Sequence, residues 1–325
     1  MRLILILAAA FLAAAPAHAF DLQGHRGARG LAPENTLAAV DQALAIGVDT
    51  LELDLVVTAD DVLVVHHDLA LSPDIARGPD GSWVSEPLPL RGLTLEAVKT
   101  YDVGRIRPGS DYARRFADQI TRDGARIPTL EEVFARVEAL GAGHVRYNLE
   151  TKIRPDRADL SPTPEAFAAL LAELVRAHGL AERVSVQSFD WRTLDAMAES
   201  APEIARVCLT AQGRFDTLEV GRPGASPWLG GRDADDAEGS APRLAAAAGC
   251  RVWSPHHEDV DPESLAEAKG LGLAVIPWTV NEIAAMRRLV EMGVDGIVTD
   301  YPNRLRALLV ERGDAVAPQV RLPRR

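Results

Sequence analysis

The sequence predicts an α/β protein, a (β/α)8 TIM barrel with an antiparallel hairpin strand after its second strand and a long insertion at its C-terminal face. Short apolar runs alternate with helical patterns along the chain, which is typical of a parallel sheet, and eight such runs indicate a closed barrel. The sequence lacks the GxGxxG and phosphate-loop patterns that an open doubly wound sheet favours. The eight candidate strands are 21–25, 49–55, 144–150, 183–188, 204–209, 250–254, 273–278 and 296–300.

Helix start signals lie between these strands. Residues 35–47 carry apolar residues at helical spacing, and Asn35 is the candidate N-cap. Thr129 and Glu132 have the spacing of a capping box, which predicts another helix start. The remaining helices are expected within 163–179, 190–200, 241–249, 262–270, 281–293 and 303–311.

One segment departs from the strand–helix alternation. Two strand-like runs on either side of residues 59–61 are joined by only about three residues, whereas a parallel crossover needs a dozen or more. The second run must therefore return antiparallel, as a hairpin. The return brings His66, His67 and Asp68 to about the level of Glu52 and Asp54.

The ends of the chain are expected to lie outside the barrel. Residues 1–19 combine a positive start, a short apolar run and small residues before Ala19, which predicts a signal peptide cleaved after Ala19 and a periplasmic or secreted protein. A retained N-terminal anchor is the alternative, but the run is short for a membrane span, so we expect no stable membrane insertion. Residues 313–325 are predicted to form a loose tail.

The barrel domain is expected to span residues 20–312, with two interruptions. These are the insertion at about 69–128 and a long loop at about 211–240, rich in glycine, proline and aspartate. Both follow strands, so both emerge at the C-terminal face, where barrel active sites lie. Loops of this length commonly serve function.

Charge and cysteine content narrow the classes of partner. The formal net charge is −12 and the sequence has no long basic run, which argues against nucleic acid as a partner. Cys208 and Cys250 both lie in apolar, strand-like stretches, which favours two buried free thiols, although export would permit a disulfide. No pattern in the sequence fixes the oligomeric state.

Acidic residues gather at the ends of the predicted strands. Strand periodicity places Glu52 and Asp54 on one face, and Glu150 ends a neighbouring strand. Three carboxylates would then converge at one barrel mouth and repel one another unless a cation neutralises them. An all-oxygen ligand set suits Mg²⁺, Ca²⁺ or Mn²⁺ better than zinc, so we expect one divalent cation, with Ca²⁺ and Mg²⁺ both open.

Basic residues and histidines are predicted at the same mouth. His25 and His67 would supply acid–base chemistry at neutral pH, and Arg26 and Lys152 are cations suited to a phosphate. Trp278 is expected either to pack on the substrate or to be an aromatic side chain of the barrel rim. The sequence contains no GxSxG motif, which disfavours a serine hydrolase.

The ordered motifs resemble one known family. GHRG…PENT, ELDL…HHD, NLETK, QSF, WTVN and DGIVTDYP, spread over residues 22–305, resemble the motif set of the glycerophosphodiester phosphodiesterases. The resemblance implies a barrel that uses a divalent metal to hydrolyse glycerophosphodiesters, small-molecule substrates, to sn-glycerol 3-phosphate and an alcohol.

The resemblance also implies roles for individual residues. Glu52, Asp54 and Glu150 match the metal ligands, and His25 and His67 match the acid–base pair, with either histidine as the acid. Arg26 and Lys152 match the phosphate contacts, and the insertion lies where such proteins cover the site. Behind these groups we expect Glu34, Gln187 and Asn281, for which a helix-dipole or capping role is the alternative.

Three hypotheses remain open at this point. The leading one is a phosphodiesterase in which water, or the substrate's own glycerol 2-hydroxyl, attacks the phosphorus. The second is a phospholipase-type barrel that cleaves lysophospholipids or phosphoinositides through a cyclic phosphate, and it needs an exposed apolar lip such as Trp83, Leu88, Leu90 and Leu93. The third is a barrel that captures phosphoesters without turning them over.

Overall fold

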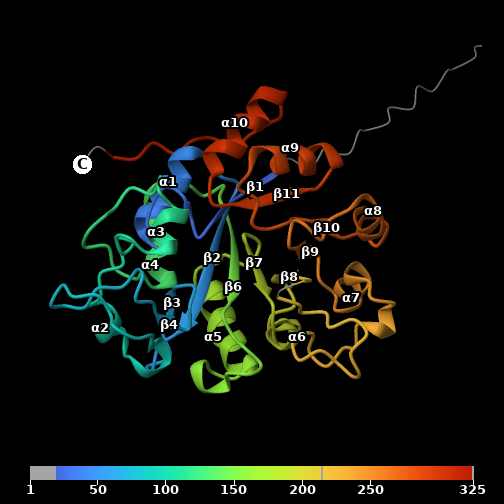
Figure 1. Cartoon of the computed structure of the whole chain (residues 1–325), viewed down its shortest axis with the longest axis horizontal. Coiled ribbons are helices and arrows are strands. Elements are labelled where there is room, and N and C mark those ends of the chain that lie inside the picture. Colours follow the sequence, from blue (N-terminus) through green and yellow to red (C-terminus); the bar gives the residue numbers. More distant parts are fainter. Residues whose placement is uncertain (1–19, 214, 324–325) are drawn as a thin grey trace, which may run out of the picture.

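The computed structural model describes residues 20–213 and 215–323, so the predicted signal peptide at 1–19 lies outside the described residues. Its centre is a parallel eight-stranded sheet that curls into a nearly closed barrel (Figure 1). The strands follow the order β10-β9-β8-β7-β6-β2-β1-β11, which confirms the predicted parallel barrel. They are β1 (Asp21–His25), β2 (Thr50–Val57), β6 (Arg146–Thr151), β7 (Val184–Ser188), β8 (Ala205–Thr210), β9 (Val252–Pro255), β10 (Ala274–Val275) and β11 (Gly296–Thr299).

The barrel has a seam between β10 and β11, where the ladder of strand pairs is interrupted. Strand β10 has only two residues, so it ends before it pairs regularly with β11. Backbone hydrogen bonds of 3.0 Å still bridge the seam: Val298 N–H donates to the Pro277 carbonyl, and Val280 N–H donates to the Val298 carbonyl. The barrel is therefore closed at this point by a few bonds instead of a full ladder.

Eight helices alternate with the eight strands. Helices α1 and α10 lie side by side, although they come from opposite ends of the chain (Figure 1). The bounds are α1 (Leu37–Ile46), α4 (Leu130–Ala139), α5 (Pro164–Ala177), α6 (Trp191–Ser200), α7 (Ala241–Ala247), α8 (Pro262–Gly270), α9 (Ile283–Met292) and α10 (Pro302–Arg312).

The predicted capping of the first two long helices is half right. The capping box of Thr129 and Glu132 opens α4 as predicted. The N-cap of α1 is Thr36, whose hydroxyl accepts from the Ala39 N–H, so the prediction for Asn35 is wrong. Asn35 instead has a positive φ of 55° and turns its side chain inward. Its amide donates to a carboxylate of the barrel interior, as described below.

Alternation along β2 explains why polar side chains enter the barrel. Leu51, Leu53 and Leu55 are fully buried in the core between strands and helices. Successive strand residues point to opposite faces, so Glu52 and Asp54 must point the other way, into the barrel. Both acidic side chains are buried as well.

The predicted hairpin is confirmed. Strand β3 (Leu63–Val65) runs antiparallel to β2, with Leu55 opposite Val65. The His66 N–H donates to the Asp54 carbonyl at 2.9 Å, so the return strand ends at the level of the inward-pointing carboxylates. Position 67 thus reaches the barrel mouth.

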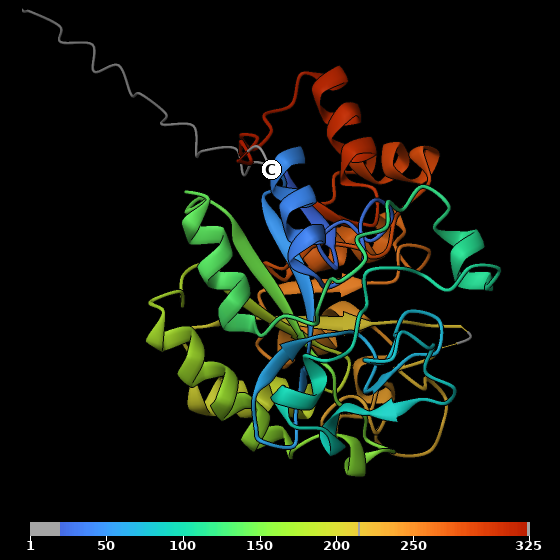
Figure 2. The ribbon, with the colours of Figure 1, turned by 90° about the vertical axis from the view of Figure 1, so that its left-hand side faces the viewer.

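The insertion forms a small core of its own against the hairpin. It contains β4 (Ala70–Leu71), β5 (Leu88–Pro89), α2 (Leu95–Val98) and α3 (Asp111–Arg115), together with the single 3-10 turn Leu90–Gly92. Figure 2 shows it, in cyan and teal, beside β2 and β3. The buried members of this core are Val56, Val64, Leu71, Ala76, Leu90, Val98, Val103 and Ile127.

The apolar lip expected from the insertion does not form. Leu90 is fully buried, and Leu88 and Leu93 pack against the small core. Trp83 lies under the guanidinium of Arg77, 5.6 Å from the ring centroid. The exposed apolar lip that a phospholipase-type barrel would need is therefore absent from the described part of the insertion.

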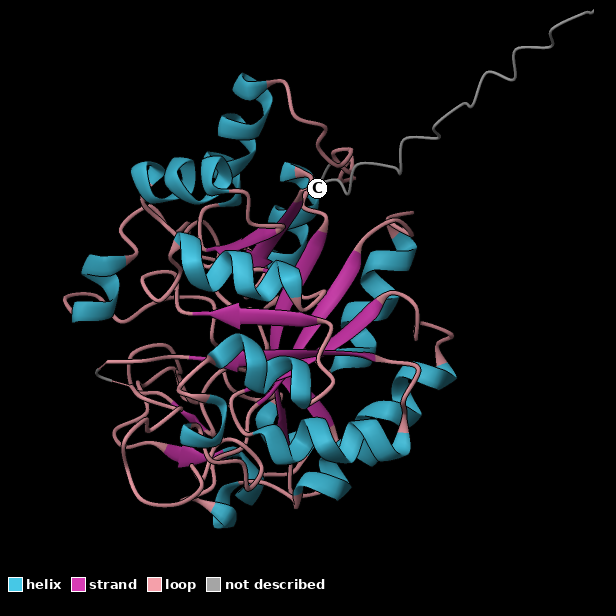
Figure 3. Ribbon diagram, turned by 90° about the vertical axis from the view of Figure 1, so that its right-hand side faces the viewer, coloured by secondary structure: helices cyan, strands magenta, loops and turns pink. Residues whose placement is uncertain are grey.

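Loops gather on one side of the strands (Figure 3), and the loop at 211–240 lies there with the insertion, because residues of both line one cleft. It includes the 3-10 turn Asp235–Ala237, and a similar turn, Ala158–Leu160, follows β6. No helix in the described ranges is long and apolar enough to cross a membrane.

The expectation of two free thiols is wrong. Cys208 and Cys250 form a disulfide with a Cα–Cα distance of 5.9 Å. Cys208 pairs with Trp253 across the β8–β9 ladder, so Cys250 lies close by at the start of the neighbouring strand. The bond closes a segment of 42 residues. A loop of this length stabilises the fold by about 4 kcal/mol in the chain-entropy account.

The tail is also more ordered than expected, as far as residue 323. The Val320 N–H donates to the Leu44 carbonyl at 2.9 Å, and Arg306 donates to the Ala317 carbonyl at 2.7 Å. Val316 and Val320 pack against the main core. The predicted loose tail thus lies along α1 and α10.

Candidate active site

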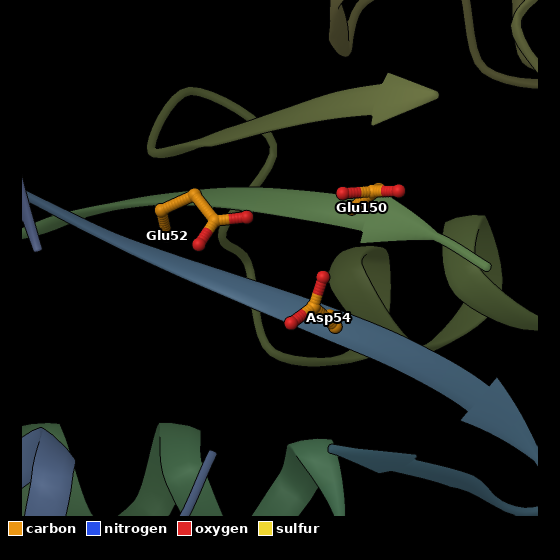
Figure 4. A group of neighbouring side chains, drawn as sticks. All are labelled: Glu52, Asp54 and Glu150. Atoms are coloured by element: carbon orange, nitrogen blue, oxygen red, sulfur yellow. The ribbon is translucent and has the colours of Figure 1, made fainter. Parts of the chain in front are cut away.

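Three carboxylates converge inside the barrel mouth. Glu52 and Asp54 come from β2 and Glu150 from the end of β6, where Asp54 and Glu150 are direct neighbours in the strand register (Figure 4). One oxygen of each side chain lies within 4.8 Å of the others, and all three side chains are buried. The predicted trio is therefore assembled by the fold.

Neighbouring groups hold each carboxylate in place. Gln187 Nε2 donates to Glu52 Oε1 at 2.7 Å, and the Arg26 backbone N–H donates to Glu52 Oε2 at 2.9 Å. Asn35 Nδ2 donates to Asp54 Oδ2 at 2.8 Å. Gln187 thus lies behind a carboxylate, where the sequence placed it.

The three carboxylates repel one another, and burial strengthens this effect. Burial, together with repulsion by Asp54 and Glu150, raises the pKa of Glu52 well above its usual range. Burial and Asp54 also raise the pKa of Glu150 to about 7, although Lys152 opposes this. Burial acts in the same direction on Asp54, but Lys152 and other cations outweigh it and hold its pKa well below the usual value.

A divalent cation bound between the three carboxylates would relieve this repulsion. Asp54 Oδ1 is buried and makes no hydrogen bond, and the nearest cationic atom is Lys152 Nζ at 3.0 Å. A buried oxygen of this kind is costly unless a charge faces it. The donors are all carboxylate oxygens, as hard cations such as Ca²⁺ and Mg²⁺ prefer.

His25, at the end of β1, is oriented by a carboxylate. Its Nδ1 lies 2.6 Å from Asp300 Oδ1 and, because a carboxylate only accepts, Nδ1 carries the proton. Asp300 also accepts two bonds from Arg29 and one from Asn281 Nδ2, at 2.7 Å. The free Nε2 of His25 lies 3.9 Å from Glu52 Oε2. Asn281 therefore supports His25 through Asp300, and the N-cap position of α9 is Glu282, whose side chain makes no capping bond.

His67 is oriented in the same way from the other side. Its Nδ1 lies 2.6 Å from Asp68 Oδ1, and a third of the side-chain surface, 33%, opens onto the cavities. Burial and the nearby cations lower the pKa of both histidines to about 4; the main cations are Arg29 for His25 and Arg26 for His67. Both rings are therefore neutral at pH 7, and each has an Nε2 able to accept a proton.

Arg26 lies between two acids. Its Nη1 donates to Glu34 Oε1 at 2.6 Å, and its Nε lies 3.3 Å from Asp54 Oδ2. Tyr112, on α3 of the insertion, donates its hydroxyl to the other oxygen of Glu34. Glu34 thus holds Arg26, the side chain predicted to contact phosphate, and Tyr112 of the insertion holds Glu34 in turn. A turn of Gly24 and Gly27 makes room here, since a Cβ at Gly24 would meet the Gly27 carbonyl at 2.1 Å.

The site residues surround an inner cavity of about 200 Å³. Lys152 Nζ donates to Glu150 Oε1 at 2.7 Å and faces this cavity with Trp278, whose Nε1 donates to the Ser254 carbonyl. His66 is buried beside the site, and its Nδ1 lies 2.8 Å from the Asp68 carbonyl. The lining residues are His25, Arg26, Arg29, Glu52, His67, Glu150, Lys152, Gln187, Phe189, Leu209, Trp278, Thr279 and Val298.

Arg29 and Tyr112 are among the groups at the site that were not predicted. Arg29 follows Arg26 by three residues in the same glycine-rich loop, and this spacing of two basic residues could have indicated a second cation at the site. Tyr112 comes from the middle of the insertion, where neither periodicity nor spacing marks it. Its role depends on how α3 folds back over the β1 loop, where Gln119 Nε2 donates to the Arg29 carbonyl.

Comparison with known proteins agrees with this arrangement. The sequence model of the glycerophosphoryl diester phosphodiesterase family matches residues 25–304. The chain belongs to this family. Its members are phosphoric diester hydrolases, so the predicted family and enzyme class are confirmed.

Individual relatives cover nearly the whole chain. A glycerophosphodiester phosphodiesterase of Caldanaerobacter subterraneus subsp. tengcongensis is 30% identical over 89% of this chain and 97% of its own. One of Bacillus subtilis is 29% identical over 86% of this chain and 83% of its own. A crystal structure of a protein from Silicibacter pomeroyi superposes with a TM-score of 0.82 at 34% identity, covering 92% and 96% of the two chains.

Proposed function

We propose that this glycerophosphodiester phosphodiesterase hydrolyses its substrates to sn-glycerol 3-phosphate and an alcohol, with one divalent cation held by Glu52, Asp54 and Glu150. The observation that carries the proposal is the pair of carboxylate-oriented histidines, His25 and His67, beside this acidic trio. Membership of the family supports the same activity. Ca²⁺ and Mg²⁺ both suit the three carboxylates.

The cation, when bound, supplies Lewis-acid polarisation of a phosphate oxygen. The side chains of the protein supply charge neutralisation and proton transfer. Arg26 and Lys152, both held by carboxylates, offset the negative charge of the phosphodiester. The neutral His25 accepts the proton of the nucleophile, water or the glycerol 2-hydroxyl, as its oxygen bonds to phosphorus.

We assign the role of general acid to His67. It lines the inner cavity and also the wider cleft outside it, whereas His25 lines only the inner cavity. The leaving alcohol must exit through the wider cleft. The bound diester anion favours the protonated ring, and as the phosphorus–oxygen bond to the alcohol breaks, His67 gives its proton to the departing oxygen.

A substrate panel tests this function. Glycerophosphocholine and glycerophosphoethanolamine are expected to release glycerol 3-phosphate, measured by a coupled dehydrogenase assay. Chelation should abolish release, and Ca²⁺ or Mg²⁺ should restore it. Failure to hydrolyse any diester with either metal supplied would contradict the proposal.

We also propose that the mature protein begins at Phe20 and resides in the periplasm or outside the cell. The amino-terminal sequence supports this, and so does the disulfide, because such bonds persist in oxidising compartments. Intact mass spectrometry of protein from a periplasmic extract should give the mass of residues 20–325, increasing by two hydrogens on reduction. Recovery of the uncleaved chain from the membrane fraction would contradict it.

A further inference from the structure

A second, larger cavity lies against the catalytic one. It is a cleft of about 690 Å³, more than three times the volume of the inner cavity. The two cavities share His67, Glu150, Lys152, Phe189 and Trp278, so they form one continuous space. A diester whose glycerophosphate end occupies the inner cavity must direct its alcohol into this outer cleft.

One wall of the outer cleft is a run of four aromatic rings. Trp278, Phe189, Phe215 and Trp228 contact one another edge to face in that order, with centroid distances of 5.2, 5.2 and 5.3 Å. All four are open to solvent in part, and Phe215 is 41% exposed. Exposed apolar surface costs about 25 cal/mol for each Å², so a shared open face of this kind indicates a ligand.

Aliphatic side chains also line the cleft. They come from the insertion and from the loop after β6, and they are Leu69, Ala70, Pro73, Pro87, Ile153 and Leu160. An apolar group in the cleft would therefore exchange water for aromatic and aliphatic neighbours.

The charged groups of the outer cleft are already paired. Arg154 donates to both oxygens of Asp156, at 2.9 and 2.8 Å, and lies 5.8 Å from the Trp228 ring centroid. The other two lining carboxylates are those of Glu150, held by Lys152, and Asp68, held by His67. Among the described residues, the carboxylates of the cleft are thus engaged by basic side chains, so charge gives the cleft little hold on a leaving alcohol.

We propose that the outer cleft is the subsite for the leaving alcohol, and that it selects diesters whose alcohol carries an aromatic or alkyl group over those with a small one. The proposal rests on the proposed phosphodiesterase activity. It differs from the lip expected of the insertion leucines, because its aromatic wall comes from the strand ends and the 211–240 loop.

Matched substrates test the selection. The ethyl and 2-phenylethyl diesters of sn-glycerol 3-phosphate both release a primary alcohol, so they differ mainly in what fills the cleft. We expect kcat/KM to be about 10-fold higher for the 2-phenylethyl diester than for the ethyl diester. Trp228→Ala and, separately, Phe215→Ala should reduce this ratio to less than about threefold. Trp83→Ala, which removes an aromatic ring outside the cleft, should leave the ratio unchanged.

Binding distinguishes the two proposals. Calorimetric titration of the inactive His25→Ala variant should show tighter binding of the 2-phenylethyl diester, and Trp228→Ala in that background should remove the difference. Equal affinities and equal kcat/KM values for the two diesters, or a preference for the ethyl diester, would overturn the subsite. Selective binding without turnover of any diester by the unmodified enzyme would overturn the phosphodiesterase proposal and leave the subsite standing.

Discussion

Replacing His67 with alanine is expected to lower kcat for glycerophosphocholine about 10³-fold, yet to slow a diester of p-nitrophenol less than about 10-fold. General acid catalysis contributes roughly 10²- to 10⁴-fold when the leaving group is a basic alkoxide. A phenolate stabilised by a nitro group departs without a proton, so it has little need of the acid. Steady-state rates on both substrates, with metal supplied, measure the difference.

Two other histidine variants serve as controls. His25→Ala should slow both substrates by a similar factor of about 10³, because the nucleophile must lose its proton in either case. His144→Ala removes an exposed histidine that precedes β6, at the end of the barrel away from the site, and should leave kcat within about twofold. Equal losses on both substrates in His67→Ala would contradict its assignment as the acid, and full activity in either site variant would contradict a catalytic role for that histidine.

Replacing Glu150 with glutamine should raise the melting temperature of the metal-free protein while abolishing its response to metal. The amide oxygen still accepts from Lys152, but the repulsion between Glu150 and Asp54 disappears. In the unmodified protein, Ca²⁺ or Mg²⁺ at 100 times its Kd should stabilise the fold by about 2.7 kcal/mol. Differential scanning calorimetry with and without each metal measures both effects.

An acidic residue remote from the trio provides the control. Asp41 on α1 pairs with Arg136 of α4, at 2.7 and 2.8 Å. Asp41→Asn should lower the melting temperature slightly and keep the full metal response. If Glu150→Gln kept the metal response, or lost stability in the absence of metal, the carboxylates would not form the cation site.

Much of this site follows from local pattern. Period-two alternation between leucines and acids predicts that Glu52 and Asp54 point inward, since the leucines must meet the helices. The short connection at 59–61 forces the hairpin, and the hairpin brings His67 to the mouth. Each inference needs only the neighbouring residues along the chain, which is why it holds in the fold.

Other features depend on contacts that local pattern does not contain. The disulfide follows from the register between β8 and β9, and a register is a property of two strands together. Tyr112 and the aromatic wall come from long loops whose paths depend on what they pack against. Asparagine is a common helix cap, which is why the sequence predicts this role for Asn35. In the fold its side-chain amide instead donates to the buried carboxylate of Asp54.

The seam between β10 and β11 has a consequence for how the enzyme fluctuates. Asn281 follows β10, Asp300 follows β11, and the bond between their side chains crosses this weakest part of the barrel. Regions held by few hydrogen bonds open locally long before the whole domain unfolds. Each such opening would remove the Asn281 bond from Asp300, whereas His25 would keep its partner, because β1 and β11 stay paired and Arg29 also holds the carboxylate. The enzyme can therefore fluctuate at its seam without releasing the catalytic imidazole.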